Sequence, residues 1–190
     1  MSRSNDWKGK LQESVDRVKS GYETVGRGTG ARFLAIVYPP DEELAVLREW
    51  KVVTRSLEPD YIVHSIDIMH ITNNVVSEIG AETIASEIQN PTMAGSSPIT
   101  DLANLWLDRI VEEIRKCSEV KVEGRIVISL ERLAALYPVA GPRDLMQRLW
   151  DSDWSIPCPV IFLIPGHLKE ARVYSFLDKQ DEFLYRGVII

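Results

Sequence analysis

Apolar residues along the chain alternate between short runs and stretches with helical spacing. The run 33–38 is continuously apolar and bounded by turn residues, which is typical of a strand buried on both faces. Residues 61–70, 125–130 and 160–164 predict three further strands. Two segments near the C-terminus, 173–177 and 183–190, predict a last pair of strands around the turn-rich residues 178–181.

Five stretches between these runs predict helices, over 7–20, 41–57, 74–88, 100–117 and 142–150. In the first helix, the apolar residues recur at steps of three and four positions and form one stripe. The core-facing residues that we expect are Trp7, Leu11, Val15, Val18, Leu44, Leu47, Val53, Leu57, Val75, Ile79, Ile88, Leu102, Leu105, Trp106, Ile110 and Ile114. Residues 133–138 fit a helix or a loop, and Pro165-Gly166-His167 predicts a sharp turn.

Strands that alternate with helices predict an α/β fold with three layers, in which a mostly parallel sheet carries helices on both faces. The C-terminal pair of strands is expected to add an antiparallel hairpin at the edge of this sheet. The length of 190 residues suits one domain over 1–190, in which 1–30 form a helix and a glycine-rich lead-in.

Charge and hydropathy exclude several classes of protein. The net charge is −6, and an acidic protein repels the phosphate backbone, so we expect no direct binding to DNA or RNA. No apolar run reaches the ~18 residues of a membrane-spanning helix. The polar N-terminus does not resemble a signal peptide, and the two cysteines, Cys117 and Cys158, cannot form a disulfide framework. We therefore expect a cytoplasmic protein with inert thiols.

A nucleotide-binding module is one alternative for such a sheet. Residues 21–28 have the glycine spacing of a phosphate loop, but Arg27 and Gly28 stand where lysine and a hydroxyl are needed. The segment also precedes a strand, whereas a phosphate loop follows one. The connection after the first strand contains Pro39 and Pro40, which lack the N–H groups that bind phosphate. We expect no cofactor.

A hydrolase is a second alternative. His64 and His70 are expected on one face of the second strand, and Asp67 on the other. His70 and His167 follow strands whose carboxyl ends can meet at one edge of the sheet. Other polar residues expected at that edge are Asp41, Asp67, Glu131 and Arg132. The same residues could simply cap strands and solvate loops, and they do not form a complete metal or triad signature.

Two tryptophans suggest an interaction surface. Trp150 and Trp154 flank the charged residues 151–153, and aromatic side chains rimmed by charge are common in protein interfaces. The alternative is that one or both pack on the core.

The segment 33–50, FLAIVYPPDEELAVLREW, contains an apolar strand, a Tyr-Pro-Pro turn, an acidic cluster and a following helix. In this order these features resemble the BrxB family of BREX anti-phage defence systems. Residues 125–190 resemble its later part, with a buried strand, Leu136-Tyr137-Pro138, a short helix and the run PVIFLIPG.

The resemblance implies a small non-enzymatic component of a phage-defence system that also includes a DNA methyltransferase. It implies a PglZ-type partner, a protein with a phosphatase fold, and it transfers no catalytic residue to this chain. We expect the partner to bind around Tyr137, Trp150, Trp154, Pro165, Gly166 and His167.

Overall fold

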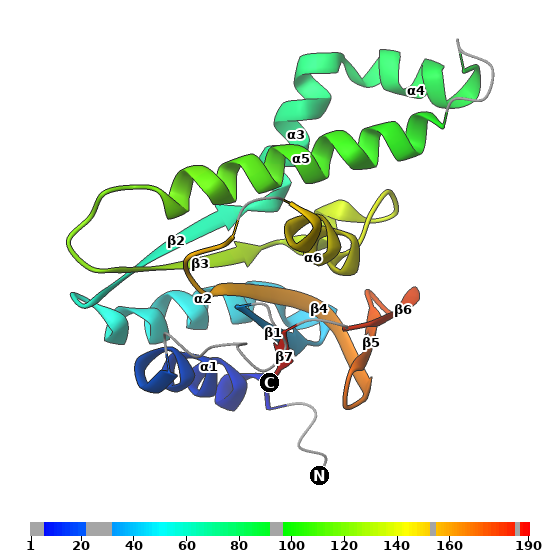
Figure 1. Ribbon diagram of the computed structural model, residues 1–190. Coiled ribbons are helices and arrows are strands. Elements are labelled where there is room, and N and C mark those ends of the chain that lie inside the picture. The colour runs from blue at the N-terminus through cyan, green and yellow to red at the C-terminus, as the bar shows by residue number, and fades with distance from the viewer. Residues whose placement is uncertain (1–5, 22–31, 92–96, 153–154, 185–186) are drawn as a thin grey trace.

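The computed structural model describes residues 6–21, 32–91, 97–152, 155–184 and 187–190 (Figure 1). The glycine-rich part of the lead-in and the predicted partner-binding residue Trp154 lie outside the described residues. The described part contains helices on both sides of a mainly parallel sheet, which confirms the predicted α/β fold.

Five parallel strands form the sheet in the order β2-β3-β4-β1-β7. They are β1 (Phe33–Tyr38), β2 (Tyr61–Asp67), β3 (Arg125–Glu131), β4 (Val160–Glu170) and β7 (Val188–Ile189). All six residues of β1 are buried, as the continuous apolar run predicts. Phe33 and Phe162 meet edge to face on neighbouring strands, with ring centroids 5.4 Å apart.

Helices α1 (Trp7–Gly21) and α2 (Glu43–Val53) lie below the sheet in Figure 1. The predicted stripe of α1 is confirmed, because all four of its apolar residues are buried. Helix α2 buries Val46, Leu47 and Trp50, whereas the prediction for Leu44 is wrong, since that side chain is 65% exposed. Val46 and Trp50 lie four positions apart on the buried face of α2, whereas Leu44 is two positions before Val46 and so lies about 160° away around the helix.

Helices α5 (Pro98–Ser118) and α6 (Pro142–Asp151) lie above the sheet and pack against each other (Figure 1). Helix α5 buries the predicted residues Leu102, Trp106, Ile110 and Ile114, and Leu105 is partly buried. A 3₁₀ turn, η6 (Leu133–Leu136), lies between β3 and α6 and settles the ambiguous segment.

The second predicted strand and the third predicted helix both need correction. Strand β2 ends at Asp67, whose side chain caps α3 (Ile68–Ile79), so His70 lies on a helix and not on the strand face of His64. Gly80, with φ 94°, separates α3 from α4 (Ala81–Gln89). This break directs α4 away from the sheet, and Ile79 and Ile88 are exposed rather than buried.

The predicted turn at Pro165-Gly166-His167 is wrong, because β4 continues through these residues to Glu170. Its extension pairs with β5 (Val173–Phe176), and β5 pairs with β6 (Gln180–Phe183), both antiparallel. A Cβ atom on Gly166 would overlap the carbonyl oxygen of Ser175, so this glycine permits the close approach of β5. The hairpin thus extends β4, while the final residues form the parallel edge strand β7.

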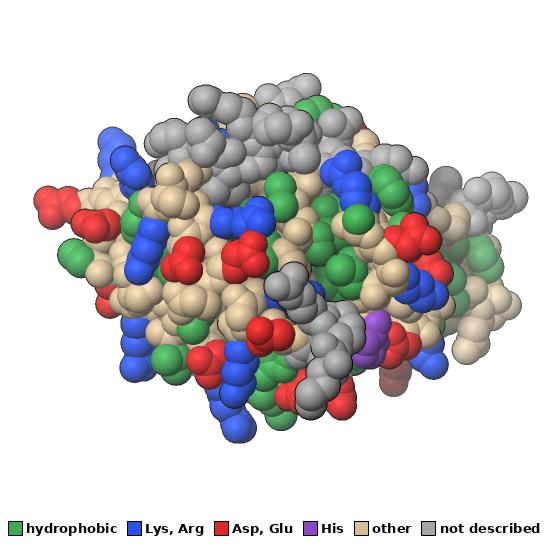
Figure 2. Space-filling view, turned by 90° about the horizontal axis from the view of Figure 1, so that it is seen from below, with side chains coloured by type: hydrophobic (Ala, Val, Ile, Leu, Met, Phe, Trp, Pro, Cys, Tyr) green, Lys and Arg blue, Asp and Glu red, His purple; other side chains and the backbone are tan. Residues whose placement is uncertain are grey.

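Basic and acidic side chains are interspersed over the face that lies below the sheet in Figure 1 (Figure 2). Over the described part of the chain, no helix combines the length and the apolar character that crossing a bilayer requires.

Candidate functional site

The carboxyl ends of β1, β2 and β3 bring together Tyr38, Glu43, Asp67, Glu131 and Arg132, which we call the carboxyl edge. The Tyr38 hydroxyl donates a hydrogen bond to Glu43 Oε1 over 3.3 Å. Asp67 forms an ion pair with Arg132 over 3.0 Å. The prediction that Asp67 and Arg132 lie at the same edge of the sheet is confirmed, and the pairing of β2 with β3 brings the two side chains into contact.

Burial raises the pKa values of two side chains at the carboxyl edge. Desolvation, together with the nearby Glu43 carboxylate, raises the pKa of the Tyr38 hydroxyl well above its usual range. Desolvation also raises the pKa of Glu43, against the hydrogen bond from Tyr38 and the positive charge of Arg132. Glu131 is buried, and its carboxylate accepts a hydrogen bond from Ser129 over 3.4 Å. The polar groups of this edge are therefore engaged mainly with each other.

The connection that follows β1 is poorly suited to phosphate. Pro39 and Pro40 supply no N–H groups, and Asp41, Glu42 and Glu43 place negative charge at the start of α2. Asp41 itself is exposed. A nucleotide at this position would face carboxylates in place of backbone donors.

The histidines of the hydrolase hypothesis have separate partners. The His70 ring lies 3.2 Å from the amide of Asn74, one turn further along α3. His167 Nδ1 lies 2.7 Å from Asp178 Oδ1, in the β4–β5–β6 region. Among the described residues, no hydrogen bond or ion pair joins the two histidines, and no group of three or more potential ligands could hold a metal ion.

Burial also makes the two cysteine thiols poor nucleophiles. Desolvation raises the pKa of Cys158 to about 12, and it raises the pKa of Cys117 as well, with the Glu113 carboxylate contributing. Both thiols therefore remain protonated near neutral pH, which supports the interpretation that they are inert.

The described members of the predicted partner-binding set lie on three parts of the fold: the segment before α6, the last turn of α6 and strand β4. Tyr137 is 39% exposed and precedes α6, whereas Trp150 is 38% exposed and lies near the other end of that helix. Pro165 and Gly166 are buried within β4, so of that predicted loop only His167 is exposed. Tyr137, Trp150 and His167 are the described members that a partner could touch.

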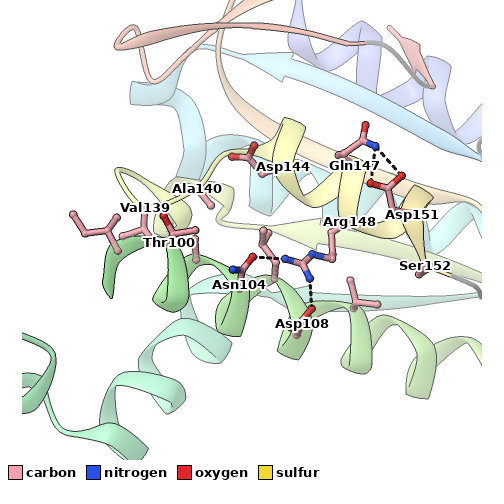
Figure 3. A pocket seen from close by; sticks show the side chains of 14 residues that line it. Thr100, Asn104, Asp108, Val139, Ala140, Asp144, Gln147, Arg148, Asp151 and Ser152 are labelled. Atoms are coloured by element: carbon pink, nitrogen blue, oxygen red, sulfur yellow. Dashed lines mark hydrogen bonds and ion pairs between the residues drawn. The ribbon is translucent and has the colours of Figure 1, made fainter. Parts of the chain in front are cut away.

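Between α5 and α6 the structure contains a groove with a volume of about 750 Å³, the α5–α6 groove (Figure 3). Its apolar side chains come mainly from α5 and from the segment before α6, and its charged side chains come mainly from α6. The lining residues are Ile99, Thr100, Ala103, Asn104, Leu107, Asp108, Val111, Val139, Ala140, Asp144, Gln147, Arg148, Asp151 and Ser152.

Arg148 crosses this groove from α6 to α5, as Figure 3 shows. Its guanidinium donates to Asp108 Oδ1 over 2.9 Å and to the side-chain oxygen of Asn104. Asp108 therefore neutralises Arg148, and the two helices are joined at the middle of the groove.

A buried carboxylate from the β5–β6 hairpin fixes the position of α6. Glu182 accepts hydrogen bonds from the Tyr174 hydroxyl, from Gln180 and from the backbone N–H of Arg143 in the first turn of α6. Desolvation raises the pKa of Glu182 although these hydrogen bonds oppose the shift. The hairpin thus caps α6 and holds one wall of the groove.

The sequence analysis missed the groove residues. Asp144, Gln147, Arg148 and Asp151 have the spacing of one helical face, which is polar, and an amphipathic α6 would be expected to expose it. The apolar residues of α5 that line the groove could not be predicted in the same way, because the sequence does not show which apolar residues of a helix the rest of the fold leaves partly exposed.

Comparisons of the chain with protein-family models, with curated proteins and with solved structures found no match. The resemblance to the BrxB family thus depends on the two sequence segments alone.

Proposed function

We propose that this chain is a non-enzymatic cytoplasmic component of a BREX-like phage-defence system, and that it docks a PglZ-type partner within the defence and DNA-modification complex. The α5–α6 groove is the observation that carries the docking role. It is open at exposed rim residues and joins apolar and charged side chains, the composition of a protein interface.

The two segments that resemble the BrxB family lie side by side in the sheet. Strand β1, from the first segment, pairs with β4, from the second, and β3 pairs with β4 as well. The resemblance thus concerns the centre of the fold, and it supports a shared scaffold more directly than a shared site.

The carboxyl edge supports a role without catalysis. Asp67 pairs with Arg132, and Glu43 accepts a hydrogen bond from Tyr38. The β1–α2 connection offers carboxylates where a nucleotide-binding protein offers N–H groups. These contacts also weaken the alternative of a nucleotide-binding module.

The test is co-expression with a PglZ-type protein of a BREX-like system, followed by size-exclusion chromatography. We expect the two proteins to elute together at micromolar concentration. Separate elution of two folded proteins would contradict the proposed function.

A matched pair of variants tests the predicted surface. Replacing Trp150 with alanine should weaken partner binding by about 1–2 kcal/mol if this side chain is an interface anchor. Phe183→Ala is the control, because Phe183 has a similar exposed fraction, 37% against 38%, but lies on β6. If the partner binds both variants with equal affinity, Trp150 does not contribute to the interface.

A further inference from the structure

The α5–α6 groove presents two carboxylates to solvent. Asp144 and Asp151 are both exposed and lie seven positions apart on one face of α6, about 10 Å along the helix axis. Arg148 lies between them, but Asp108 already neutralises its charge. The groove therefore carries a net negative charge.

The position of Asp151 indicates that this charge lacks compensation within α6. Asp151 is the last residue of the helix, where the helix dipole disfavours a carboxylate. Among the described residues, its side chain accepts hydrogen bonds only from Gln147, an uncharged neighbour on the same helix. Asp144 is in the first turn and accepts from the backbone N–H of Gly141. A cation bound at Asp151 would be favoured by both the carboxylate and the helix end.

An apolar strip runs beside these carboxylates. Ala103, Leu107 and Val111 recur every four residues on α5, and Val139 and Ala140 add to the strip from the segment before α6. Ile99, 48% exposed, extends the strip at the start of α5. From Ile99 to Val111 the groove follows about 18 Å of helix, or roughly three turns.

We propose that this groove binds one basic amphipathic helix of a protein partner. Two lysine or arginine residues seven positions apart on that helix would reach Asp144 and Asp151, because the spacing on two helices lying side by side is the same. Apolar residues three and four positions after the first of them would pack on Ala103 and Val111, which are partly buried on either side of the buried Leu107. The exposed rim favours a macromolecular segment over a small molecule, since small-molecule sites enclose most of the ligand surface.

The identity of the partner rests on the proposed docking function, whereas the chemistry of the helix follows from the groove. The test can therefore use two synthetic peptides of roughly 15 residues, long enough for a helix of several turns. The first carries two lysines seven positions apart in an alanine–glutamine background. Two leucines lie three and four positions after the first lysine. The second has glutamate in place of both lysines.

Fluorescence anisotropy then measures the affinity of each labelled peptide for the full chain and its variants. We expect the basic peptide to bind at least about ten-fold more tightly than the acidic one, and Asp144→Asn/Asp151→Asn to remove this preference. Asp144→Lys/Asp151→Lys should favour the acidic peptide. Asp41→Asn/Asp60→Asn is the control, because it removes the same charge at two exposed residues outside the groove.

Equal affinities for the two peptides, or an equal loss in the control variant, would overturn the groove as a site for a basic helix. Circular dichroism spectra that match the unmodified protein establish that each variant is folded. Co-elution of the PglZ-type partner with Asp144→Asn/Asp151→Asn, at unchanged affinity, would also overturn this inference while leaving the docking function intact. If the peptides bind as expected and the partner does not co-elute, the proposed function fails and the groove assignment stands.

Discussion

The carboxyl edge and the α5–α6 groove both gather acidic side chains, and they differ in where the partners of those side chains come from. At the carboxyl edge, Glu43 and Asp67 contact Tyr38 and Arg132 from other elements of the same fold. In the groove, Asp144 and Asp151 are exposed. Within the part of the chain that the structure describes, they accept hydrogen bonds only from α6 or from the residue before it. Similar residue types therefore stabilise the fold in one region and remain available to a partner in the other.

The largest expected effect comes from Glu182, which holds the wall of the groove. Glu182→Ala leaves the Tyr174 hydroxyl and the Arg143 N–H without their buried acceptor, so we expect it to lower the free energy of unfolding by about 3 kcal/mol. Urea denaturation measures this loss. Asp181→Ala is the control, since Asp181 is exposed and its ion pair with Lys169 is expected to contribute less than about 1 kcal/mol. Similar losses in both variants would mean that the hairpin does not hold α6.

Gly166 tests whether a predicted docking residue is structural. Gly166→Ala forces a Cβ atom against the Ser175 carbonyl, and we expect a loss of about 2 kcal/mol in the free energy of unfolding. Thermal denaturation measures it, with Gly9→Ala in α1 as the control, where only the flexible Asp6 side chain has to move. An unchanged melting temperature for Gly166→Ala would show that β5 does not approach β4 this closely.

Asp67 tests the internal pairing of the carboxyl edge. Asp67→Ala removes the cap of α3 and the ion pair with Arg132, for an expected loss of about 1 kcal/mol. Asp67→Asn keeps a capping oxygen and should cost less. Chemical denaturation of both variants separates the cap from the ion pair, and an alanine variant as stable as the unmodified protein would contradict the role given to Asp67.

Much of the fold follows from the sequence. Strand β1 is predicted correctly because burial on both faces requires an apolar residue at every position, and the α1 stripe because burial of one helix face gives a regular spacing. The β2–α3 boundary was missed because Ile68, Met69 and His70 continue an apolar pattern, while the helix start depends on the Asp67 cap. Pro165-Gly166 read as a turn because the sequence does not show that a neighbouring strand needs the space beside Gly166.

Less of the candidate site than of the fold could be predicted from the sequence. A shared edge for Asp67 and Arg132 follows from their places near the carboxyl ends of parallel strands, whereas their ion pair depends on β2 and β3 being neighbours. The α5–α6 groove depends on how closely two helices pack, and no single segment encodes that distance. The Glu182 contacts link residues about 40 positions apart and arise from the path of the hairpin over the start of α6.

The pH dependence of stability gives a smaller effect. The pKa of Glu182 is raised in the folded state, so the stability it contributes is fully present below its usual pKa of 4.5 and is lost as the pH rises through the folded-state value. The stability advantage of the unmodified protein over Glu182→Gln should therefore decrease from pH 4 towards pH 7. Urea denaturation across this range measures it, and an advantage that grows with pH would contradict the direction of the shift.

The smallest expected effect is the response to nucleotides. Because carboxylates occupy the β1–α2 connection, we expect ATP or GTP with Mg²⁺ to leave the melting temperature unchanged. A ligand at one hundred times its dissociation constant would stabilise the protein by about 2.7 kcal/mol, which thermal shift detects readily. Such a shift would show that the carboxyl edge binds a ligand and is not purely structural.

Hydrogen–deuterium exchange of the chain, alone and with the PglZ-type partner, is the most direct test of the central claim that docking takes place at the groove. The account predicts slower exchange on binding in α6 and in the first half of α5, with the segments that carry Tyr38, Asp67 and Arg132 unchanged. Protection confined to those carboxyl-edge segments, with α5 and α6 unaffected, would contradict it.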